Sequence, residues 1–300
     1  MRWEDFRQSS NVEDDRDGGG GGFGLPFHGG GLGIGGMVVL GIIGWAFGIN
    51  PFYLIQGAEM LNRGSGGYYE QPASNVRTSQ PTDETGKFVA AVLGNTEDVW
   101  TQIFQERGAT YRPPHLRLFN GSEQGGCGTA QAAMGPFYCP NDRRIYLDTS
   151  FFRDMRQRFH GCSGKPCDFA EAYVIAHEVG HHVQNLLGVL PKAHQAQQAS
   201  GSRAQANRIQ VRVELQADCF GGVWANRSNQ KWKTVEPGDA EAALQTASAI
   251  GDDRLQKQAR GYAVPDSFTH GTSAQRQRWF MTGLKQGTIA ACNTFTAAQL

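Results

Sequence analysis

A long uncharged segment near the N-terminus divides this chain of 300 residues into unequal parts. No Asp, Glu, Lys or Arg occurs between Asp17 and Glu59, and residues 32–55 are largely apolar. Because about 20 apolar residues span the hydrocarbon core of a bilayer, this length is sufficient for one crossing. Glycine recurs in the segment, which disfavours a helix in water but is tolerated in a membrane helix. The sequence therefore predicts a single transmembrane helix over residues 32–55.

This anchor separates a short N-terminal segment from a large C-terminal domain. Residues 1–31 are rich in glycine, and residues 56–82 are polar and typical of a linker. Residues 83–300 carry the patterns of a folded domain, with short alternating strands first and helical periodicity from Asp168 onwards. This order predicts an α+β fold with a small sheet and a mostly helical C-terminal half.

The Lys and Arg residues that flank an anchor predict its orientation, because they are enriched on the cytoplasmic side. Arg2, Arg7 and Arg16 precede the anchor, whereas Arg63 alone follows it closely. We therefore expect a single-pass protein of the bacterial inner membrane, with a cytoplasmic N-terminus and a periplasmic or otherwise extracytoplasmic domain. A cleaved signal peptide is disfavoured because a long acidic segment precedes the apolar one. The Gly44–Gly48 spacing suggests a homodimer through the membrane helix.

The cysteines indicate an oxidising compartment. All six follow the predicted anchor, and an even number on the outer side is typical of disulfide bonds. The first two and the next two can each close a short loop, which leaves the last two as the remaining pair, although six cysteines allow fifteen pairings. A structural zinc site is the alternative, but no C-x-x-C pair occurs. The candidates are Cys127, Cys139, Cys162, Cys167, Cys219 and Cys292.

The charge balance argues against one class of partner. Lys and Arg together number 28, as do Asp and Glu, so the formal net charge is zero. Proteins that bind nucleic acid follow its phosphate backbone with an excess of Lys and Arg. We therefore expect no nucleic-acid partner.

Two histidines four residues apart lie on a predicted helix. Residues 168–187 have helical periodicity, end before Gly188, and contain His177-Glu-Val-Gly-His181. Side chains four residues apart share a helix face, so both imidazoles can bind one metal ion, and zinc is the ion expected. Glu178 lies beside the first ligand and can accept a proton from a zinc-bound water. The helix is apolar on both sides of the motif, where unpaired histidines would be unfavourable. The pattern predicts one Zn²⁺ per chain.

A catalytic zinc ion needs a third protein ligand. No H-x-x-G-x-x-H continuation follows the motif, and His182 points off the metal-binding face. Glu214 is the next candidate, and Asp218 lies one turn further along the same predicted helix. Asp218 can accept the free N–H of a ligating histidine and so fix its tautomer. The alternative, in which both carboxylates are solvated on an exposed face, is disfavoured by the apolar residues around them.

The combination of H-E-x-x-H with E-x-x-x-D resembles the gluzincin type of zinc metallopeptidase. That resemblance implies that His177, His181 and Glu214 bind zinc, that Glu178 is the general base and that Asp218 supports the site. The chain is more closely similar to the neutral zinc metallopeptidase family of bacteria, of YpfJ type, over nearly its whole length. The resemblance implies a membrane-anchored, zincin-like metallopeptidase domain. The segments that carry it are Gly135–Pro140, Tyr146–Asp148, Ala176–Gln184, Glu214–Asp218, Gly251–Arg254 and Thr269–Ser273.

A peptidase also needs a hydrogen-bond donor for the oxyanion that develops on the scissile carbonyl. His270-Gly-Thr-Ser-x-x-Arg276 resembles the H-P-x-x-x-R element of the HtpX and CAAX protease types, with Gly271 in place of proline. His270 is therefore the candidate catalytic donor, and Tyr262 is the second choice. The alternative is that residues 269–273 only cap the helix that follows.

The sequence therefore predicts a membrane-anchored zinc endopeptidase that cleaves peptides or proteins with a zinc-activated water. Residues 136–139 or 143–147, both read as strands, can pair with an extended substrate. One alternative is a zinc-stabilised envelope module that binds a partner without catalysis, which would have no need of Glu178. A second alternative is a zinc hydrolase that acts on a non-peptide amide.

Overall fold

The structure is a computed structural model, and it describes residues 1–16, 80–131, 135–157, 162, 166–249 and 251–300. One compact unit comprises Met1–Asp15 and Thr78–Leu300. The predicted anchor over residues 32–55, its Gly44–Gly48 spacing and nearly all of the predicted linker lie outside the described residues. In the part of the chain that is described, no helix has the length and hydropathy to cross a bilayer.

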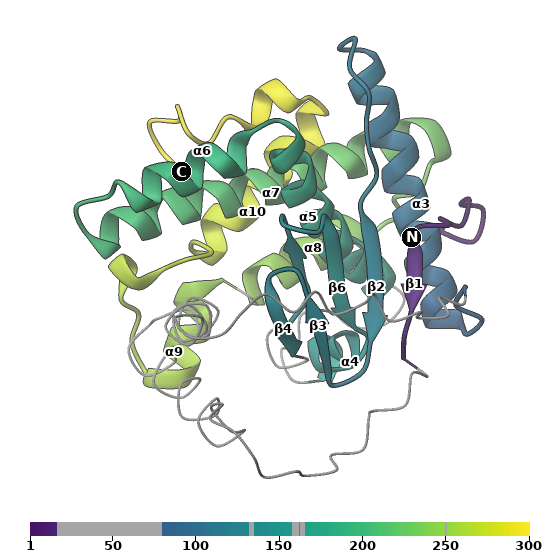
Figure 1. Ribbon diagram of the computed structural model, residues 1–300, viewed down its shortest axis with the longest axis horizontal. Coiled ribbons are helices and arrows are strands. Elements are labelled where there is room, and N and C mark those ends of the chain that lie inside the picture. Colours follow the sequence, from purple (N-terminus) through teal and green to yellow (C-terminus); the bar gives the residue numbers. More distant parts are fainter. Residues whose placement is uncertain (17–79, 132–134, 158–161, 163–165, 250) are drawn as a thin grey trace, which may run out of the picture. The chain divides into compact units, whose positions relative to one another are not determined.

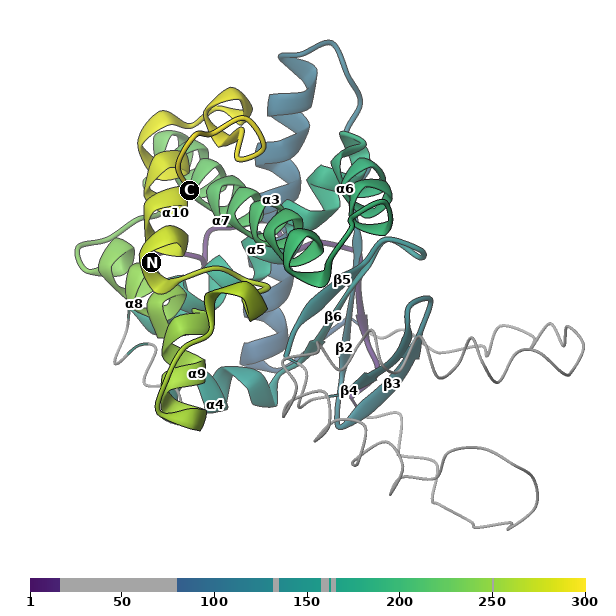
Figure 2. The same cartoon turned by 90° about the vertical axis from the view of Figure 1, so that its left-hand side faces the viewer.

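A four-stranded sheet forms the first layer of this unit. Its order is β1-β2-β6-β5, in which β1, β2 and β6 are parallel (Figure 1) and β5 runs antiparallel to β6 (Figure 2). A separate hairpin consists of β3 and β4. The strands are β1 (Val12–Asp14), β2 (His115–Phe119), β3 (Ser122–Gly125), β4 (Gly128–Gln131), β5 (Phe137–Cys139) and β6 (Arg144–Asp148).

Helices form the remainder of the unit and most of its C-terminal half. In Figure 2 the sheet lies on one side of α5, and α7 and α10 lie on the other. The α+β fold class is therefore confirmed, with the small sheet before the long helices. The helices are α3 (Glu84–Gln105), α4 (Ser150–Gln157), α5 (Cys167–Leu186), α6 (Val189–Gln198), α7 (Arg203–Trp232), α8 (Asp239–Ala249), α9 (Asp252–Arg260) and α10 (Ser273–Gln286), with 3-10 turns η2 (Pro265–Ser267) and η3 (Ile289–Cys292).

Helix α5 has the predicted extent, and nearly all of its side chains are buried. Its apolar residues face three directions because the helix packs against α3, α7, α8 and the strand β5. Gly188 adopts a left-handed conformation with φ of 73°, which ends α5 and allows α6 to begin. A helix surrounded in this way holds its side chains in fixed positions, and the H-E-x-x-H motif lies in its C-terminal half.

The N-terminal residues differ from the prediction that residues 1–31 form a segment outside the domain. Residues 1–15 belong to the same compact unit as the domain, and β1 pairs with β2. Met1, Phe6 and Val12 are buried in the main core. The strand β1 has only three residues, so its alternation was too short to be recognised in the sequence.

Three disulfide bonds join the six cysteines in the pairs that the short loops favoured. Cys127 is bonded to Cys139, Cys162 to Cys167, and Cys219 to Cys292. The first bond ties the β3–β4 hairpin to β5, and the third ties α7 to η3. The prediction of disulfides, rather than a cysteine-bound zinc ion, is confirmed.

Candidate metal centre

The candidate metal centre lies at the contact of α5 with α7, and a glycine allows the two helices to approach. A Cβ atom on Gly180 would lie 2.9 Å from the carbonyl oxygen and 3.1 Å from the Cα of Ala217. The first distance is shorter than real Cβ contacts and the second is tighter than most of them, so a side chain at position 180 would push the two helices apart. The close approach brings Glu214, on α7, to the face of α5 that carries the two imidazoles.

Three potential ligand atoms converge at this contact. The Nε2 atoms of His177 and His181 lie 3.3 Å and 3.4 Å from Oε2 of Glu214. The two imidazole rings are 4.8 Å apart between centroids and nearly perpendicular. All three ligand atoms lie within 4.8 Å of one another. The predicted ligand set is therefore brought together, and the fourth side of a tetrahedral ion would remain open.

Each of the three side chains has a second hydrogen-bond partner that orients it. Asp218 lies 2.8 Å from Nδ1 of His177, as predicted. The Oε1 atom of Gln184 lies 2.9 Å from Nδ1 of His181. Gln210 donates from Nε2 to Oε1 of Glu214 at 2.7 Å. These contacts leave the Nε2 atoms and one carboxylate oxygen directed at the common centre, which is how outer contacts orient metal ligands.

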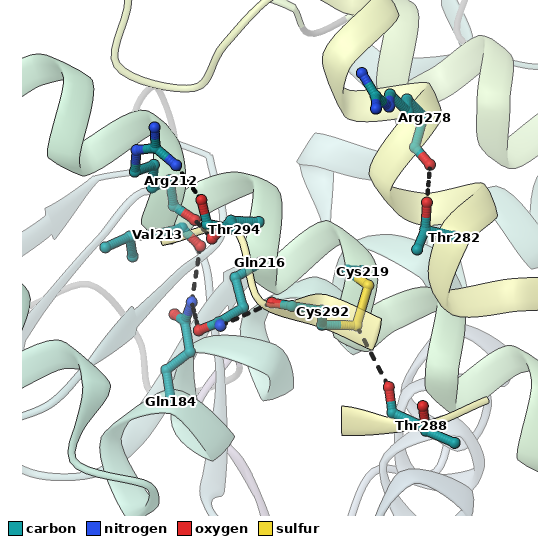
Figure 3. The surroundings of a disulfide bond; sticks show 10 residues. All are labelled: Gln184, Arg212, Val213, Gln216, Cys219, Arg278, Thr282, Thr288, Cys292 and Thr294. Atoms are coloured by element: carbon teal, nitrogen blue, oxygen red, sulfur yellow. Dashed lines mark hydrogen bonds between the residues drawn. A yellow bond between two sulfur atoms is a disulfide. The ribbon is translucent and has the colours of Figure 1, made fainter. Parts of the chain in front are cut away.

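Gln184 and the third disulfide hold this part of α7 in place (Figure 3). The amide of Gln184 donates from α5 to the carbonyl oxygen of Val213 at 2.8 Å and to Gln216 at 3.0 Å. Gln216 then donates to the carbonyl oxygen of Cys292 at 2.9 Å. The chain of hydrogen bonds therefore runs from a histidine ligand, across the turn of α7 that carries Glu214, to the disulfide.

Asp218 is fully buried and satisfies more groups than one histidine. Its carboxylate accepts hydrogen bonds from the hydroxyl of Tyr173 at 2.6 Å and from Nε and an Nη of Arg276 at 2.8 Å each. Burial alone would raise the pKa of Asp218, but the Arg276 guanidinium and His177 hold that pKa well below its usual range. Asp218 therefore stays ionised and fixes His177 against both α7 and α10.

The electrostatics of His177 and Glu214 favour a bound cation. Burial alone would lower the pKa of His177, but Asp218 and Glu214 outweigh it and raise that pKa to about 10. Burial alone would raise the pKa of Glu214, but the two imidazoles hold it well below its usual range. The carboxylates of Asp218 and Glu214 therefore stabilise a positive charge at this buried site. A set of two imidazoles and one carboxylate is a known donor set for catalytic zinc, so these residues fit that ion.

Glu178 lies beside the ligand set and next to the edge of the sheet. Its side chain is buried, and the backbone N–H of Tyr138 in β5 donates to its carboxylate. Burial raises the pKa of Glu178 above its usual range, although the two neighbouring histidines oppose this shift. The predicted general base is therefore held between the metal centre and an edge strand.

His182 points away from the centre, as the sequence indicated. Its ring nitrogens lie 3.1 Å from the hydroxyl of Tyr138 and 2.6 Å from the carbonyl oxygen of Arg112. Burial lowers the pKa of His182 to about 4. This histidine is neutral and connects α5 to the sheet rather than to the metal centre.

The comparisons with known proteins place the chain in a family that is named for zinc. A family described as "putative neutral zinc metallopeptidase" matches residues 1–295. The chain belongs to this family. It is 47% identical to the uncharacterized protein YpfJ of Escherichia coli K12 over 98% of this chain and 99% of that protein. It is 45% identical to the uncharacterized protein Rv2575 of Mycobacterium tuberculosis H37Rv over 76% of each chain. No solved structure matches the chain.

Membership of the neutral zinc metallopeptidase family supports a hydrolase and implies zinc at the family level.

His270 lies in the loop before α10, and it is close enough to Glu214 for an electrostatic interaction. Thr272 also caps α10 with Gln275, so the capping alternative for residues 269–273 is correct for Thr272. Tyr262 is 62% exposed after α9 and, within the described residues, makes no hydrogen bond to the ligand set.

Four residues of the centre were not predicted from the sequence, namely Gln184, Gln210, Tyr173 and Arg276. Gln210 lies one helical turn before Glu214, and Tyr173 lies one turn before His177, so each shares a face with a ligand. That spacing could have identified both residues, although Tyr173 also fits the apolar pattern of its helix. Arg276 ends the element that begins at His270, but its ion pair with Asp218 spans 58 residues and leaves no local pattern.

Proposed function

We propose that this protein is a membrane-anchored, zinc-dependent endopeptidase with a zincin-like catalytic domain and one zinc ion per chain. The observation that carries this proposal is the convergence of His177, His181 and Glu214 with Glu178 beside them. A metal site with a purely structural role has no need of a buried carboxylate next to an open coordination position. Family membership supports the hydrolase class, and the geometry supports the peptidase mechanism.

The residues around the centre suit hydrolysis of a peptide bond. When bound, zinc supplies a Lewis acid that polarises a carbonyl group and lowers the pKa of water. The carboxylate of Glu178 accepts a proton from the attacking water and returns it to the nitrogen of the leaving amine. The imidazole of His270 donates a hydrogen bond to the oxygen of the scissile carbonyl as negative charge develops on it.

The substrate is a peptide or protein segment in extended conformation. Of the two candidate strands, β6 lies between β2 and β5, so both of its edges are already paired. The strand β5 lies at the edge of the sheet, and the N–H of Tyr138 reaches Glu178 from it. An extended substrate that adds to β5 would therefore pass beside the general base.

The disulfides and the apolar segment define the expected location. Three disulfide bonds are typical of a domain outside the cytoplasm, which supports the extracytoplasmic face of the bacterial inner membrane. Residues 32–55 associate with the lipid bilayer in this proposal, and the Gly44–Gly48 spacing remains its candidate contact for a homodimer. The substrates are therefore proteins of the cell envelope.

The test compares the zinc-loaded full chain with its Glu178→Gln variant on an unfolded protein substrate. The full chain is used because residues 1–15 belong to the folded unit. We expect the variant to retain one zinc ion per chain and to cleave roughly 10²–10⁴ times more slowly, because a general base is lost. Glu241→Gln, which changes an exposed carboxylate on α8, is the control and should cleave at the wild-type rate. Similar rates in both variants would contradict the mechanism, and no cleavage by the wild type would favour a binding module.

A further inference from the structure

The segment Gly251–Asp253 forms a clasp on the loop that carries His270. The Oδ2 atom of Asp252 accepts three consecutive backbone N–H groups, those of Thr269 at 2.6 Å, His270 at 2.5 Å and Gly271 at 3.1 Å. Its Oδ1 atom lies 3.4 Å from Nδ1 of the His270 imidazole, and the hydroxyl of Thr269 lies 3.1 Å from the same nitrogen. One carboxylate therefore holds both the backbone and the side chain of this histidine.

The neighbouring residues complete the clasp. Asp253 accepts hydrogen bonds from the backbone N–H and the hydroxyl of Ser273, both at 2.8 Å. A Cβ atom on Gly251 would lie 2.6 Å from both the backbone nitrogen and the hydroxyl oxygen of Ser273, so glycine is required at this contact. These two contacts explain why a glycine precedes two aspartates at the start of α9, and they fix the end of the loop at which α10 begins.

The loop is also seated against the turn of α7 that carries Glu214. Gly271 has φ of 88°, and a Cβ atom there would lie 3.3 Å from side-chain carbons of Val211 and Leu215. The Asp252 side chain is 12% exposed, whereas that of His270 is 45% exposed. The buried carboxylate therefore holds a histidine whose ring is open to a substrate beside the metal centre.

We propose that Asp252 is a positioning residue that orients the His270 imidazole for hydrogen bonding to the substrate carbonyl. This role rests on the proposed peptidase function. The carboxylate of Asp252 binds at Nδ1, so the opposite nitrogen, Nε2, is directed away from the clasp. The negative charge of Asp252 also favours the doubly protonated imidazole, which is the form that can donate from Nε2 while Nδ1–H stays bonded to the carboxylate.

The experiment is a double-mutant cycle of Asp252→Asn and His270→Ala in the zinc-loaded full chain. His270→Ala should lower kcat about 10²–10³-fold, as removal of an oxyanion donor does. Asp252→Asn should lower kcat on the order of ten- to a hundredfold with little change in KM, because a hydrogen bond to a charged group is weakened. In the His270→Ala background, Asp252→Asn should have no further effect on kcat.

The control is Asp266→Asn, which changes a carboxylate that is 77% exposed in the same connection and that pairs with the exposed Arg208. It should leave kcat unchanged. Additive losses in the double variant, or wild-type kcat in Asp252→Asn, would overturn the role of Asp252 while the peptidase proposal stands. A wild-type chain that cleaves nothing would overturn the proposed function, and this role with it.

A second inference comes from the N-terminal segment, residues 1–15, which is built into the domain. The buried carboxylate of Glu97 on α3 accepts hydrogen bonds from Ser9 at 2.6 Å, from Asn11 at 2.7 Å and from Arg7 at 2.7 Å. The backbone of the segment is bonded as well, with the N–H of Ser9 donating to Ala90 at 2.9 Å.

Apolar contacts and strand pairing add to these hydrogen bonds. Trp3 packs edge-on against Phe88, with ring centroids 5.4 Å apart, and Phe6 packs against Trp232. Val12 is 2% exposed and lies opposite Leu116 in the parallel pair of β1 and β2. The segment thus contacts α3, the sheet and the end of α7, and separating it would expose all of these surfaces.

We infer that residues 1–15 lie on the same side of the membrane as the domain. The apolar residues 32–55 lie between these two parts in the sequence. Because residues 1–15 pack against the domain, the chain between them must cross a bilayer an even number of times or not at all. The single crossing that the Arg distribution favoured is therefore incompatible with the packed N-terminal segment.

The test compares how two introduced thiols react with a membrane-impermeant maleimide in cells. All six natural cysteines are in disulfides, so the wild-type chain gives the background. Asp5→Cys places a thiol on the exposed part of the N-terminal segment, and Lys192→Cys places one on exposed α6. We expect the same ratio of labelling before and after cell lysis at both sites, whichever side the domain occupies. Labelling of position 192 in intact cells, with position 5 labelled only after lysis, would overturn the inference and leave the peptidase proposal unaffected.

Discussion

Two regions of the molecule depend on a close contact at a glycine. One is the metal centre between α5 and α7, and the other is the contact of the N-terminal segment with α3. In each, a glycine without a Cβ atom allows a second piece of backbone to approach a helix: Gly180 faces Ala217, and Gly94 faces the carbonyl oxygen of Arg7. In each, buried carboxylates are satisfied by side chains of the partner, as Asp218 and Glu97 show.

The two regions differ in the part of the chain that packs against the glycine. At the metal centre both partners are long helices inside the core, so neither can move away without unfolding the domain. On α3 the partner is a short terminal segment that holds one three-residue strand. The same steric conflict should therefore destabilise the whole fold in the first region and release one segment in the second.

The largest expected effect comes from the buried ion pair of the metal centre. Asp218→Asn removes the carboxylate charge that Arg276 binds and that orients His177. Loss of one partner of a buried pair typically lowers the free energy of unfolding by about 3–5 kcal/mol. Zinc affinity should fall about 10–100-fold, because Asp218 orients a ligand.

Denaturant unfolding of the metal-free chain and zinc competition with a chelator would measure these two effects. Glu241→Gln again supplies the control, with both quantities unchanged, because its carboxylate is exposed. An Asp218→Asn variant with wild-type stability would show that the ion pair with Arg276 does not hold α10 to the metal centre.

A smaller effect is expected from Gly180→Ala, and the chain offers a matched control. The new methyl group would lie 2.9 Å from the carbonyl oxygen of Ala217, so the two helices must separate. Overpacking of this kind lowers the free energy of unfolding by about 1–3 kcal/mol. Zinc affinity should fall as well, because Glu214 moves away from the histidines.

Gly221→Ala tests the same helix pair without the conflict, because its Cβ atom would lie 3.7 Å or more from Tyr173 and His177. Since alanine is the better helix former, this variant should equal or exceed the wild type in stability, by up to about 1 kcal/mol. Urea unfolding of both variants decides the matter. Equal stability of the two would mean that Gly180 does not set the distance between α5 and α7.

The centre could be predicted from the sequence where its contacts are local. His177, Glu178 and His181 lie within five positions of one helix, and Glu214 and Asp218 lie one turn apart on another, so helical spacing reports each set. The family resemblance then indicated that the two helices contribute ligands to one metal ion. The α+β class followed from the order of strand and helix patterns, since that order survives even where single boundaries are wrong.

Contacts between distant segments left no such signal. The pair of Arg276 with Asp218 spans 58 residues, and the contact of Ser9 with Glu97 spans 88. Gly94 shows the consequence. Glycine is unfavourable inside a helix, yet α3 continues through it from Glu84 to Gln105. The glycine is there because the backbone of Arg7 crosses the helix at that point, which only the folded chain reveals.

Gly94→Ala should therefore have the smallest effect on global stability and a large local one. The new methyl group would fall on the carbonyl oxygen of Arg7, while α3 itself gains about 0.5–1 kcal/mol in helix propensity. Because the segment is terminal, it can move away and leave the rest of the domain folded. Hydrogen exchange should show faster exchange at Ser9, whose N–H donates to Ala90, with α5 unchanged. Wild-type protection at Ser9, or equal loss of protection in α5, would contradict the idea that the segment docks as a separable unit. Loss of protection confined to the N-terminal segment would distinguish this region from the metal centre. There, the steric conflict in Gly180→Ala must act on both α5 and α7 at once.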